Sequence, residues 1–191
     1  YLDQANATVT VFAPDKLQHH VINHYTGEQT EEFRNVLVEA ARIARGHIKP
    51  LNACNPDEFD ALVIPGGYGV AKNLSNLAFS GADAEIDPLF LDVVAAFANA
   101  KKPIGAICIA PAILAVALKG IISPTVTTRE DAGTASVIES TGAKHQSCAT
   151  TGFVVDETNH IASCSAYMRE DRIADVAKGI EKVVHWVVQN A

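Results

Sequence analysis

The sequence predicts an α/β protein in which a mostly parallel β-sheet is covered by helices on both faces. Short apolar, β-branched runs alternate along the chain with longer runs whose apolar residues recur at helical spacing. Turns rich in Gly, Pro, Asn and Asp separate these runs, and no internal repeat, low-complexity tract or linker interrupts the sequence. The 191 residues, of which 48% are hydrophobic, suffice for a single packed domain over residues 1–191.

Local signals place the individual elements. Asp87 and Pro88 form an N-cap and a first helical residue, and glycines at 46 and 142 are expected to end two other helices. The helix after Pro88 is expected to bury Phe90, Val93, Val94 and Phe97 on one face. The expected strands cover 8–13, 48–51, 61–64, 104–107, 125–128, 152–155 and 160–163, with a small hairpin within 19–30. The other expected helices cover 35–45, 112–118 and 134–141, and a last helix begins near residue 169.

The beginning of the chain predicts a further element. Residues 1–7 have the pattern of the end of a helix, and they run directly into the strand at 8–13. We therefore expect that the domain has a first strand and the start of a first helix before residue 1. In a doubly wound sheet such a strand lies inside the sheet, beside the strand that carries the active site.

The most informative stretch is the junction between the apolar strand at 104–107 and the helical run that begins at Ala112. Pro111 is tolerated in the first turn of a helix, so Cys108 falls at the strand-to-helix turn. Ala106 and Ala110 flank it with small side chains, as a nucleophile elbow requires. A helix N-terminus favours the thiolate form of such a cysteine. The alternative interpretation is a small hydrophobic cysteine in a core strand.

A second stretch, residues 64–69, places Gly66 and Gly67 directly after the buried strand at 61–64. If this strand lies beside the Cys108 strand, the N–H groups of Gly67 and Ile109 are positioned to form an oxyanion hole. The alternative is an ordinary turn between a strand and a helix. The stretch is not a phosphate loop, because it contains neither G-x-G-x-x-G nor a following Gly-Lys-Ser/Thr.

Composition excludes several classes of partner. The formal charge of −7, without a cluster of Lys or Arg, argues against nucleic acid and against an anionic membrane surface. The cysteines at 54, 108, 148 and 164 have no zinc-ligand spacing, and we expect neither a metal nor a cofactor. Free cysteines fit a reducing compartment such as the cytoplasm. Cys148 and Cys164 are expected to lie in strands of the core.

Several motifs resemble the ThiJ/PfpI superfamily, which has a class I glutamine amidotransferase-like fold. They are Ala-Leu-Val-Ile-Pro-Gly-Gly-Tyr-Gly at 61–69, Ala-Lys-Asn-Leu-Ser at 71–75 and Gly-Ala-Ile-Cys-Ile-Ala-Pro at 105–111. Val-Ile-Asn-His-Tyr-Thr-Gly-Glu at 21–28, the run at 34–43 and Ala-Tyr-Met at 166–168 resemble the enhancing-lycopene-biosynthesis, or ES-one-type, branch. The resemblance covers essentially the whole chain. It implies a flavodoxin-like three-layer sandwich, a nucleophilic Cys108 and an oxyanion hole at Gly67 and Ile109.

The sequence departs from that pattern at the residue after the cysteine. Protease and amidotransferase relatives have a His there or later in a triad, whereas this chain has Ile109. Peptidase and glutaminase chemistry then lack an obvious group to protonate an amine leaving group. The glutamate that family members carry after their first strand falls in the expected preceding segment, so the resemblance names no acid/base partner for Cys108.

Other polar residues are weaker candidates. His24, Gly66 and Tyr167 are expected in a substrate pocket, although His24 is equally explained as a surface residue of the hairpin. Asn73 is expected to cap the helix after the glycine loop. Arg129 follows a strand where relatives place a polar group, and it is equally explained as a solvated arginine.

The resemblance and the missing His together predict an enzyme that acts on a small aldehyde, of the glutathione-independent glyoxalase type that converts methylglyoxal to lactate. One alternative is a non-catalytic redox-sensing or protective protein that uses an oxidisable Cys108. A second is an amidohydrolase. A homodimer is an expected assembly, and a mitochondrial location is expected if the source is a eukaryote.

Overall fold

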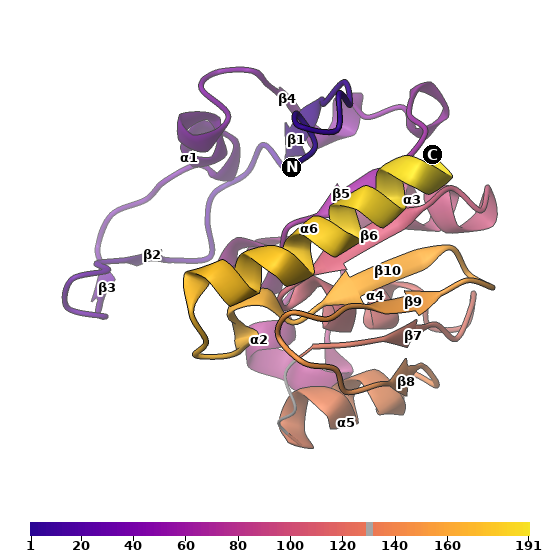
Figure 1. The fold of residues 1–191 in the computed structure, drawn as a ribbon. Coiled ribbons are helices and arrows are strands. Elements are labelled where there is room, and N and C mark those ends of the chain that lie inside the picture. Colours follow the sequence, from indigo (N-terminus) through magenta and orange to yellow (C-terminus); the bar gives the residue numbers. More distant parts are fainter. Residues whose placement is uncertain (129–131) are drawn as a thin grey trace.

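The computed structural model describes residues 1–128 and 132–191, and its centre is a four-stranded sheet (Figure 1). The strands are β5 (Leu62–Ile64), β6 (Ile104–Ile107), β10 (Ile161–Cys164) and β9 (Val154–Asp156), in that order across the sheet. β5 and β10 run parallel to β6, and β9 is antiparallel to β10. The register pairs Ile64 with Ala106 and Cys164 with Ile107, so three strands end at one edge of the sheet.

Helices cover both faces of this sheet. α6 (Ile173–Asn190) packs along β5, β6 and β10 on one face, and α4 (Ala110–Ala117) packs on β6 from the other face with α3 (Pro88–Asn99) beside it. The larger apolar cluster lies on the α3 and α4 side, and a smaller one lies between the sheet and α6. This is the predicted flavodoxin-like α/β sandwich. The buried face of α3 contains the four residues that the sequence predicted, and Ala98 in addition.

One glycine of β6 permits the close approach of α6. A Cβ atom at Gly105 would lie 2.9 Å from Cγ2 of Val187 and 3.1 Å from Cγ1 of Val183. Both valines are buried, so the absence of a side chain at 105 lets the helix pack directly on the strand that leads to Cys108.

The first fifty residues form smaller sheets beside this centre. β1 (Val11–Ala13) pairs in parallel with β4 (Ile48–Pro50), and α1 (Val36–Ile43) connects them through the predicted Gly46 turn. β2 (Val21–Ile22) and β3 (Gln29–Thr30) form the predicted hairpin. Within the described residues β1 pairs only with β4, and β5 pairs only with β6, so each has one edge without a strand partner. The strand expected before residue 1 stays a prediction.

The other elements are short. β7 (Thr125–Val126) pairs in parallel with β8 (Lys144–His145), a strand that the sequence did not predict. α5 (Ala132–Ser140) connects the two strands along the chain. α2 (Leu77–Ser80) is a single turn, and no described helix is long and apolar enough to cross a membrane. The remaining turns are η1 (Leu51–Ala53), η2 (Pro56–Glu58), the π-helical η3 (Val70–Leu74), η4 (Gly81–Asp83) and η5 (Ala166–Met168).

Candidate active site

Cys108 occupies the strained turn that the sequence predicted between β6 and α4. Its φ angle is +65°, in the left-handed region that residues other than glycine rarely adopt and that is enriched at functional sites. The Cys108 N–H donates to the carbonyl of Cys164, 3.0 Å away, which ties the elbow to the end of β10. The side chain is half-buried, and Pro111 stands in the first turn of α4 as expected.

The loop after β5 lies directly against this elbow. A Cβ atom at Gly66 would lie 2.3 Å from the carbonyl oxygen of Ile107 and 2.9 Å from Cβ of Cys108. Gly66 and Gly67 have φ angles of +82° and +85°. Only glycine provides both the absence of a side chain at 66 and the left-handed backbone, so the loop sequence is fitted to the elbow.

The space beside Gly67 is open, in contrast to Gly66. Apart from Gly67 itself and its two chain neighbours, no atom of the described residues lies within 4 Å of the position that a Cβ at Gly67 would take. Its carbonyl accepts the N–H groups of Val70 and Ala71, which fixes the loop as it enters η3. Within the described residues, neither the Gly67 N–H nor the Ile109 N–H donates to a backbone carbonyl. Both remain candidate donors to an oxyanion.

Sequence reasoning missed a buried hydroxyl at the same edge of the sheet. Ser165 follows β10 directly, one residue beyond the register partner of Ile107. It is fully buried, and its Oγ has no hydrogen-bond partner among the described residues. An isolated serine after a strand carries no sequence pattern, so only its burial distinguishes it.

The other three cysteines differ from Cys108 in their surroundings. Burial raises the pKa of Cys164 to about 12. Burial, with the negative charge of Glu58 as a smaller cause, raises the pKa of Cys54. Cys148 was predicted in a core strand, and that prediction is wrong: β8 ends at His145, and Cys148 lies half-buried in the polar loop that follows. Its Sγ lies 3.7 Å from Oγ1 of Thr127.

The weaker candidates that the structure describes lie in separate segments of the fold. Tyr167 is exposed in η5, next to Ala166, which packs in the same cluster as Cys108. His24 lies in the exposed turn of the β2–β3 hairpin, which projects away from the central sheet (Figure 1). Its role in a pocket stays a prediction. Arg129 lies outside the described residues. Among the described residues, no carboxylate or imidazole is hydrogen-bonded to the Cys108 thiol.

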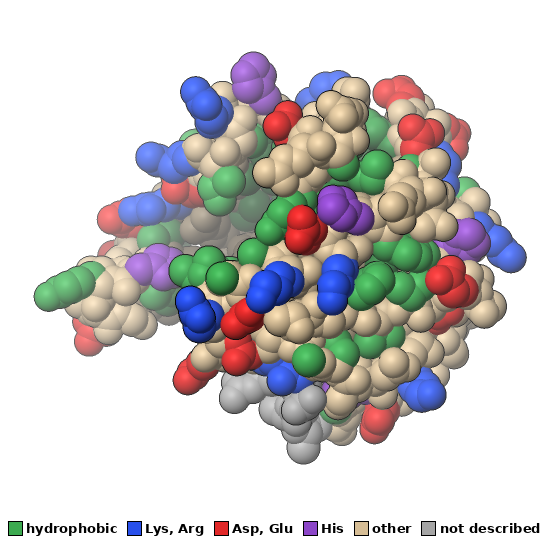
Figure 2. All heavy atoms as spheres, in the orientation of Figure 1, with side chains coloured by type: hydrophobic (Ala, Val, Ile, Leu, Met, Phe, Trp, Pro, Cys, Tyr) green, Lys and Arg blue, Asp and Glu red, His purple; other side chains and the backbone are tan. Residues whose placement is uncertain are grey.

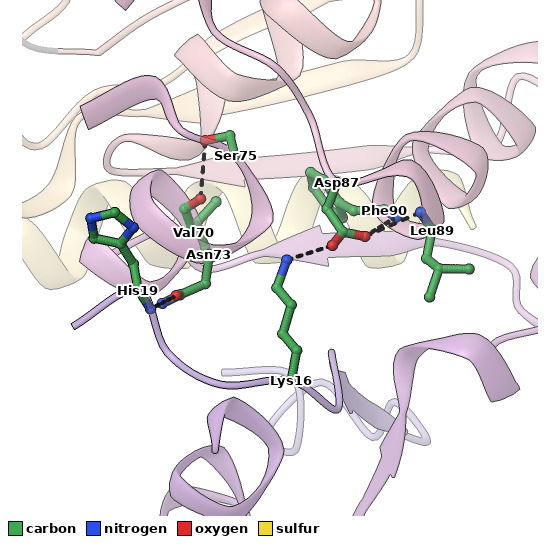
Figure 3. Close-up of polar contacts among 8 residues, drawn as sticks. All are labelled: Lys16, His19, Val70, Asn73, Ser75, Asp87, Leu89 and Phe90. Atoms are coloured by element: carbon green, nitrogen blue, oxygen red, sulfur yellow. Dashed lines mark hydrogen bonds and ion pairs between the residues drawn. The ribbon is translucent and has the colours of Figure 1, made fainter. Parts of the chain in front are cut away.

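Residues 14–20 form a strap that runs beside η3, with His19 next to Asn73 (Figure 3). Asn73 does not cap a helix as predicted; it lies within η3, and its Oδ1 accepts the His19 N–H at 2.8 Å. His20 Nε2 lies 2.9 Å from Nζ of Lys72. Desolvation lowers the pKa of His20, and the charges of Lys72 and His19 lower it further.

The same strap is fixed to α3. Lys16 Nζ lies 2.5 Å from Oδ2 of Asp87, the residue whose Oδ1 caps the helix at the N–H groups of Leu89 and Phe90. These contacts position the first fifty residues against the segment that carries the glycine loop. The described residues contain no group of three or more His, Cys, Asp and Glu side chains that could hold a metal ion.

The model of the DJ-1/PfpI family matches residues 2–170. The chain is 40% identical to the rat (Rattus norvegicus) mitochondrial ES1 protein homolog over 196 residues, which cover 99% of this chain and 74% of the relative. It is 39% identical to the human (Homo sapiens) mitochondrial glutamine amidotransferase-like class 1 domain-containing protein 3, with 99% and 73% covered.

Two solved structures are also similar to this chain. An isoprenoid biosynthesis protein with an amidotransferase-like domain from Ehrlichia chaffeensis superposes with a TM-score of 0.93 at 46% identity, covering 99% of this chain and 86% of that one. Glyoxalase III from Candida albicans shares the fold, with a TM-score of 0.52 at 12% identity, covering 81% of this chain and 68% of that one. The elbow, the glycine loop beside it and these matches over nearly the whole chain show that the protein belongs to the DJ-1/PfpI family.

Proposed function

We propose that this protein is a cysteine-nucleophile enzyme that converts small reactive carbonyl compounds, with methylglyoxal to lactate as the reaction to test. The observation that carries the proposal is the strained, half-buried Cys108 with the open side of Gly67 next to it. A backbone strained at one cysteine between a buried strand and a helix is typical of a positioned nucleophile.

The first step is attack of the Cys108 thiolate on the aldehyde carbon. A C–S bond forms, and the electron pair of the C=O bond moves onto oxygen, which gives a hemithioacetal oxyanion. The N–H groups of Gly67 and Ile109 would stabilise that charge, as fixed backbone donors do in a site shielded from water. The loop that presents Gly67 is held in place by its contact with the elbow.

The later steps need no amine leaving group. A base moves the proton from the former aldehyde carbon to the neighbouring carbon, which converts the hemithioacetal to a thioester without net oxidation. Water then attacks the thioester, releasing lactate and the thiol. In this proposal Cys108 provides the nucleophile, and the N–H groups of Gly67 and Ile109 provide the oxyanion donors.

The test is lactate formation from methylglyoxal by the purified protein, without added glutathione. Cys108→Ser is expected to reduce lactate formation to the buffer background. Cys54→Ser is the matched control, because Cys54 is a half-buried thiol directly after the η1 turn, outside the elbow. Full activity in the Cys108→Ser variant would refute the assignment.

A second function rests on the contrast among the thiols. Cys108 is half-buried in the strained turn, whereas Cys164 is fully buried with a raised pKa, so peroxide would modify the sulfur of Cys108 in preference to that of Cys164. A redox sensor would form no lactate and would gain sulfenic and sulfinic acid at Cys108 in mild peroxide, as peptide mass spectrometry measures. The names of the human and Ehrlichia relatives refer to amidotransferases, so ammonia release from glutamine is the third assay.

The names of two relatives also suggest a compartment for this protein. The rat and human relatives are named mitochondrial. We extend this to the present chain as a mitochondrial location in a eukaryotic source and a cytoplasmic one otherwise. Fractionation of the source cell with an antibody against the protein would decide between the two.

A further inference from the structure

A cluster of aromatic and basic side chains lies beside the glycine loop, where the strap meets η3 and α2. We call it the Lys72 cluster: it comprises His19, His20, Tyr68, Lys72 and Phe79. Nζ of Lys72 lies 2.9 Å from Nε2 of His20 and 4.6 Å from the centre of the Tyr68 ring. The centres of the His19 and Phe79 rings are 4.2 Å apart, and the rings are tilted by 34°. Three separate segments of the chain therefore meet around one ammonium group.

The backbone holds this cluster in place. Asn73, next to Lys72 in η3, accepts the His19 N–H, as Figure 3 shows. η3 is a π-helical turn, and such turns occur frequently at functional sites. The carbonyl of Gly67 accepts the N–H groups of its first two residues. Lys72 is therefore fixed on the same loop as the candidate oxyanion donor Gly67.

The charge of Lys72 has no counterion in this cluster. Lys72 is half-buried, and no ion pair between described residues includes it. Residues 16–27 and 61–82, the two stretches that contain the cluster, have no Asp or Glu. A half-buried charge without a counterion is unfavourable, so the cluster favours an incoming anion.

Several other cations of the chain lie beside carboxylates. Figure 2 shows Lys and Arg side chains intermixed with Asp and Glu side chains on the visible face of the molecule. Lys178 lies 2.8 Å from Asp175, and Lys16 of the strap pairs with Asp87. In a chain with a formal charge of −7, a cluster whose segments lack carboxylates is a favourable place for an anion.

The hydrogen bonding of Lys72 leaves donors for a ligand. A lysine ammonium has three N–H donors and no acceptor, so Nε2 of His20 accepts the bond between them and the ring has its proton on Nδ1. Desolvation lowers the pKa of His20, and the charge of Lys72 lowers it further, so the ring is neutral at neutral pH. The other two N–H groups of Lys72 form no hydrogen bond with a described residue.

The rings of the cluster restrict the rest of the ligand. Tyr68 is 74% exposed and Phe79 is 51% exposed, so both rings can contact a bound molecule. Aromatic faces pack favourably on planar groups. One ammonium with two imidazoles matches a single anionic group, in contrast to the repeated phosphates of a nucleic acid.

We propose that the Lys72 cluster binds a small organic anion, a carboxylate or a phosphate monoester that carries a planar group. The anionic group lies on the Lys72 ammonium and the adjacent imidazoles, and the planar group lies against Tyr68 and Phe79. This binding needs no turnover at Cys108, so it is tested independently of the proposed reaction.

Isothermal titration calorimetry of the full chain tests the proposal with benzoate and phenyl phosphate, which distinguish a carboxylate from a phosphate ligand. At least one of them is expected to bind at least about 10-fold more tightly than benzamide, which has the ring without the charge. It is also expected to bind more tightly than acetate or inorganic phosphate, which have the charge without the ring. Binding of neither aromatic anion, or no preference over these counterparts, would overturn the proposal.

Substitutions then locate the bound anion. Lys72→Gln is expected to weaken binding on the order of 10- to 100-fold, whereas Lys72→Arg, which keeps the charge, is expected to retain it. Lys144→Gln, which removes an exposed lysine from β8, is the matched control and should bind like the unmodified chain. The ring C–H NMR signals of His19 and His20 should shift as the anion binds, and they report on the site even if Lys72→Gln does not fold. Unchanged affinity in Lys72→Gln, or no shift of either histidine signal, would contradict the proposal.

Discussion

Replacing Gly66 with Ala tests the fit between the glycine loop and the elbow most directly. The new Cβ would lie 2.3 Å from the Ile107 carbonyl oxygen, and that pair must separate by at least about 0.7 Å to reach the 3.0 Å below which real Cβ contacts are essentially absent. The new Cβ would also lie 2.9 Å from Cβ of Cys108, so both of the residues it meets, Ile107 and Cys108, belong to the elbow. The elbow must therefore move or the loop must leave it.

The expected loss of folding free energy in Gly66→Ala has two parts. A left-handed residue other than glycine costs about 1–2 kcal/mol, and overpacking a close contact costs about 1–3 kcal/mol more. Gly67→Ala is the matched control, since Gly67 has nearly the same φ but its new Cβ would have no described atom within 4 Å beyond the adjacent residues. Gly66→Ala should thus be about 1–3 kcal/mol less stable than Gly67→Ala, with the difference arising from the contact alone.

Urea denaturation of both variants measures the stability difference. Iodoacetamide labelling of Cys108, resolved by peptide, measures the displacement of the thiol, and lactate formation is expected to fall on the order of 10- to 100-fold for a displacement near 1 Å. If Gly66→Ala and Gly67→Ala had equal urea midpoints and equal Cys108 labelling, the proposed contact between loop and elbow would be refuted.

Three further predictions concern stability. Asp87→Ala should cost about 1–2 kcal/mol in urea denaturation, because it removes the cap of α3 and the contact with Lys16, whereas Asp87→Asn retains the cap and should cost less. Because the pKa of the Cys164 thiol is raised in the folded protein, the unfolded chain loses the thiol proton at lower pH. The free energy of unfolding should therefore fall by about 1.4 kcal/mol per pH unit from about pH 9 towards about 12. In Cys164→Ala this fall of the urea midpoint with pH should disappear, and an unchanged fall would contradict the raised pKa of Cys164. Ser165→Ala should raise stability by about 1 kcal/mol, because it removes a buried hydroxyl without a partner, and a lower urea midpoint would show that the hydroxyl is bonded in solution.

Local signals predicted the elbow because each of them acts within a few residues. A buried strand, small flanking side chains and Pro111 determine where the chain turns, and the structure places Cys108 in that turn. The adjacency of the two informative stretches was also predictable. Consecutive strands of an α/β sheet tend to be neighbours, and β5 and β6 are paired as expected.

Weak periodicity explains the errors in the second half of the chain. The polar segment after His145 has no pattern that fixes a strand register, so Cys148 was placed in a strand although it lies in a loop. The last helix was expected near residue 169 and begins at Ile173, which is 72% exposed. Its buried face starts only at Val176, where the helix reaches the sheet.

Contacts between distant residues could not be predicted from local patterns at all. The His19 N–H reaches Asn73 across 54 positions, and Lys16 reaches Asp87 across 71. Asn73 illustrates the ambiguity: an amide after a glycine loop predicts a cap, but the strap presents an N–H to it, and this contact decides its role. The polar residues that hold the strap are therefore visible only once the fold brings residues 14–20 onto η3.

The candidate site is built from residues whose placement depends on short stretches of sequence. The candidate nucleophile and its two candidate oxyanion donors come from short stretches with defined backbone geometry. They are Cys108 and Gly67, which both have positive φ angles, and Ile109, the residue before α4. Such elements fold correctly wherever β5 and β6 pair. The specificity of the proposed reaction would instead depend on side chains outside these stretches, such as those of η5, whose Ala166 packs in the same cluster as Cys108. Substitutions in η5 would then change which carbonyl compound is accepted, while the proposed chemistry at Cys108 would stay the same.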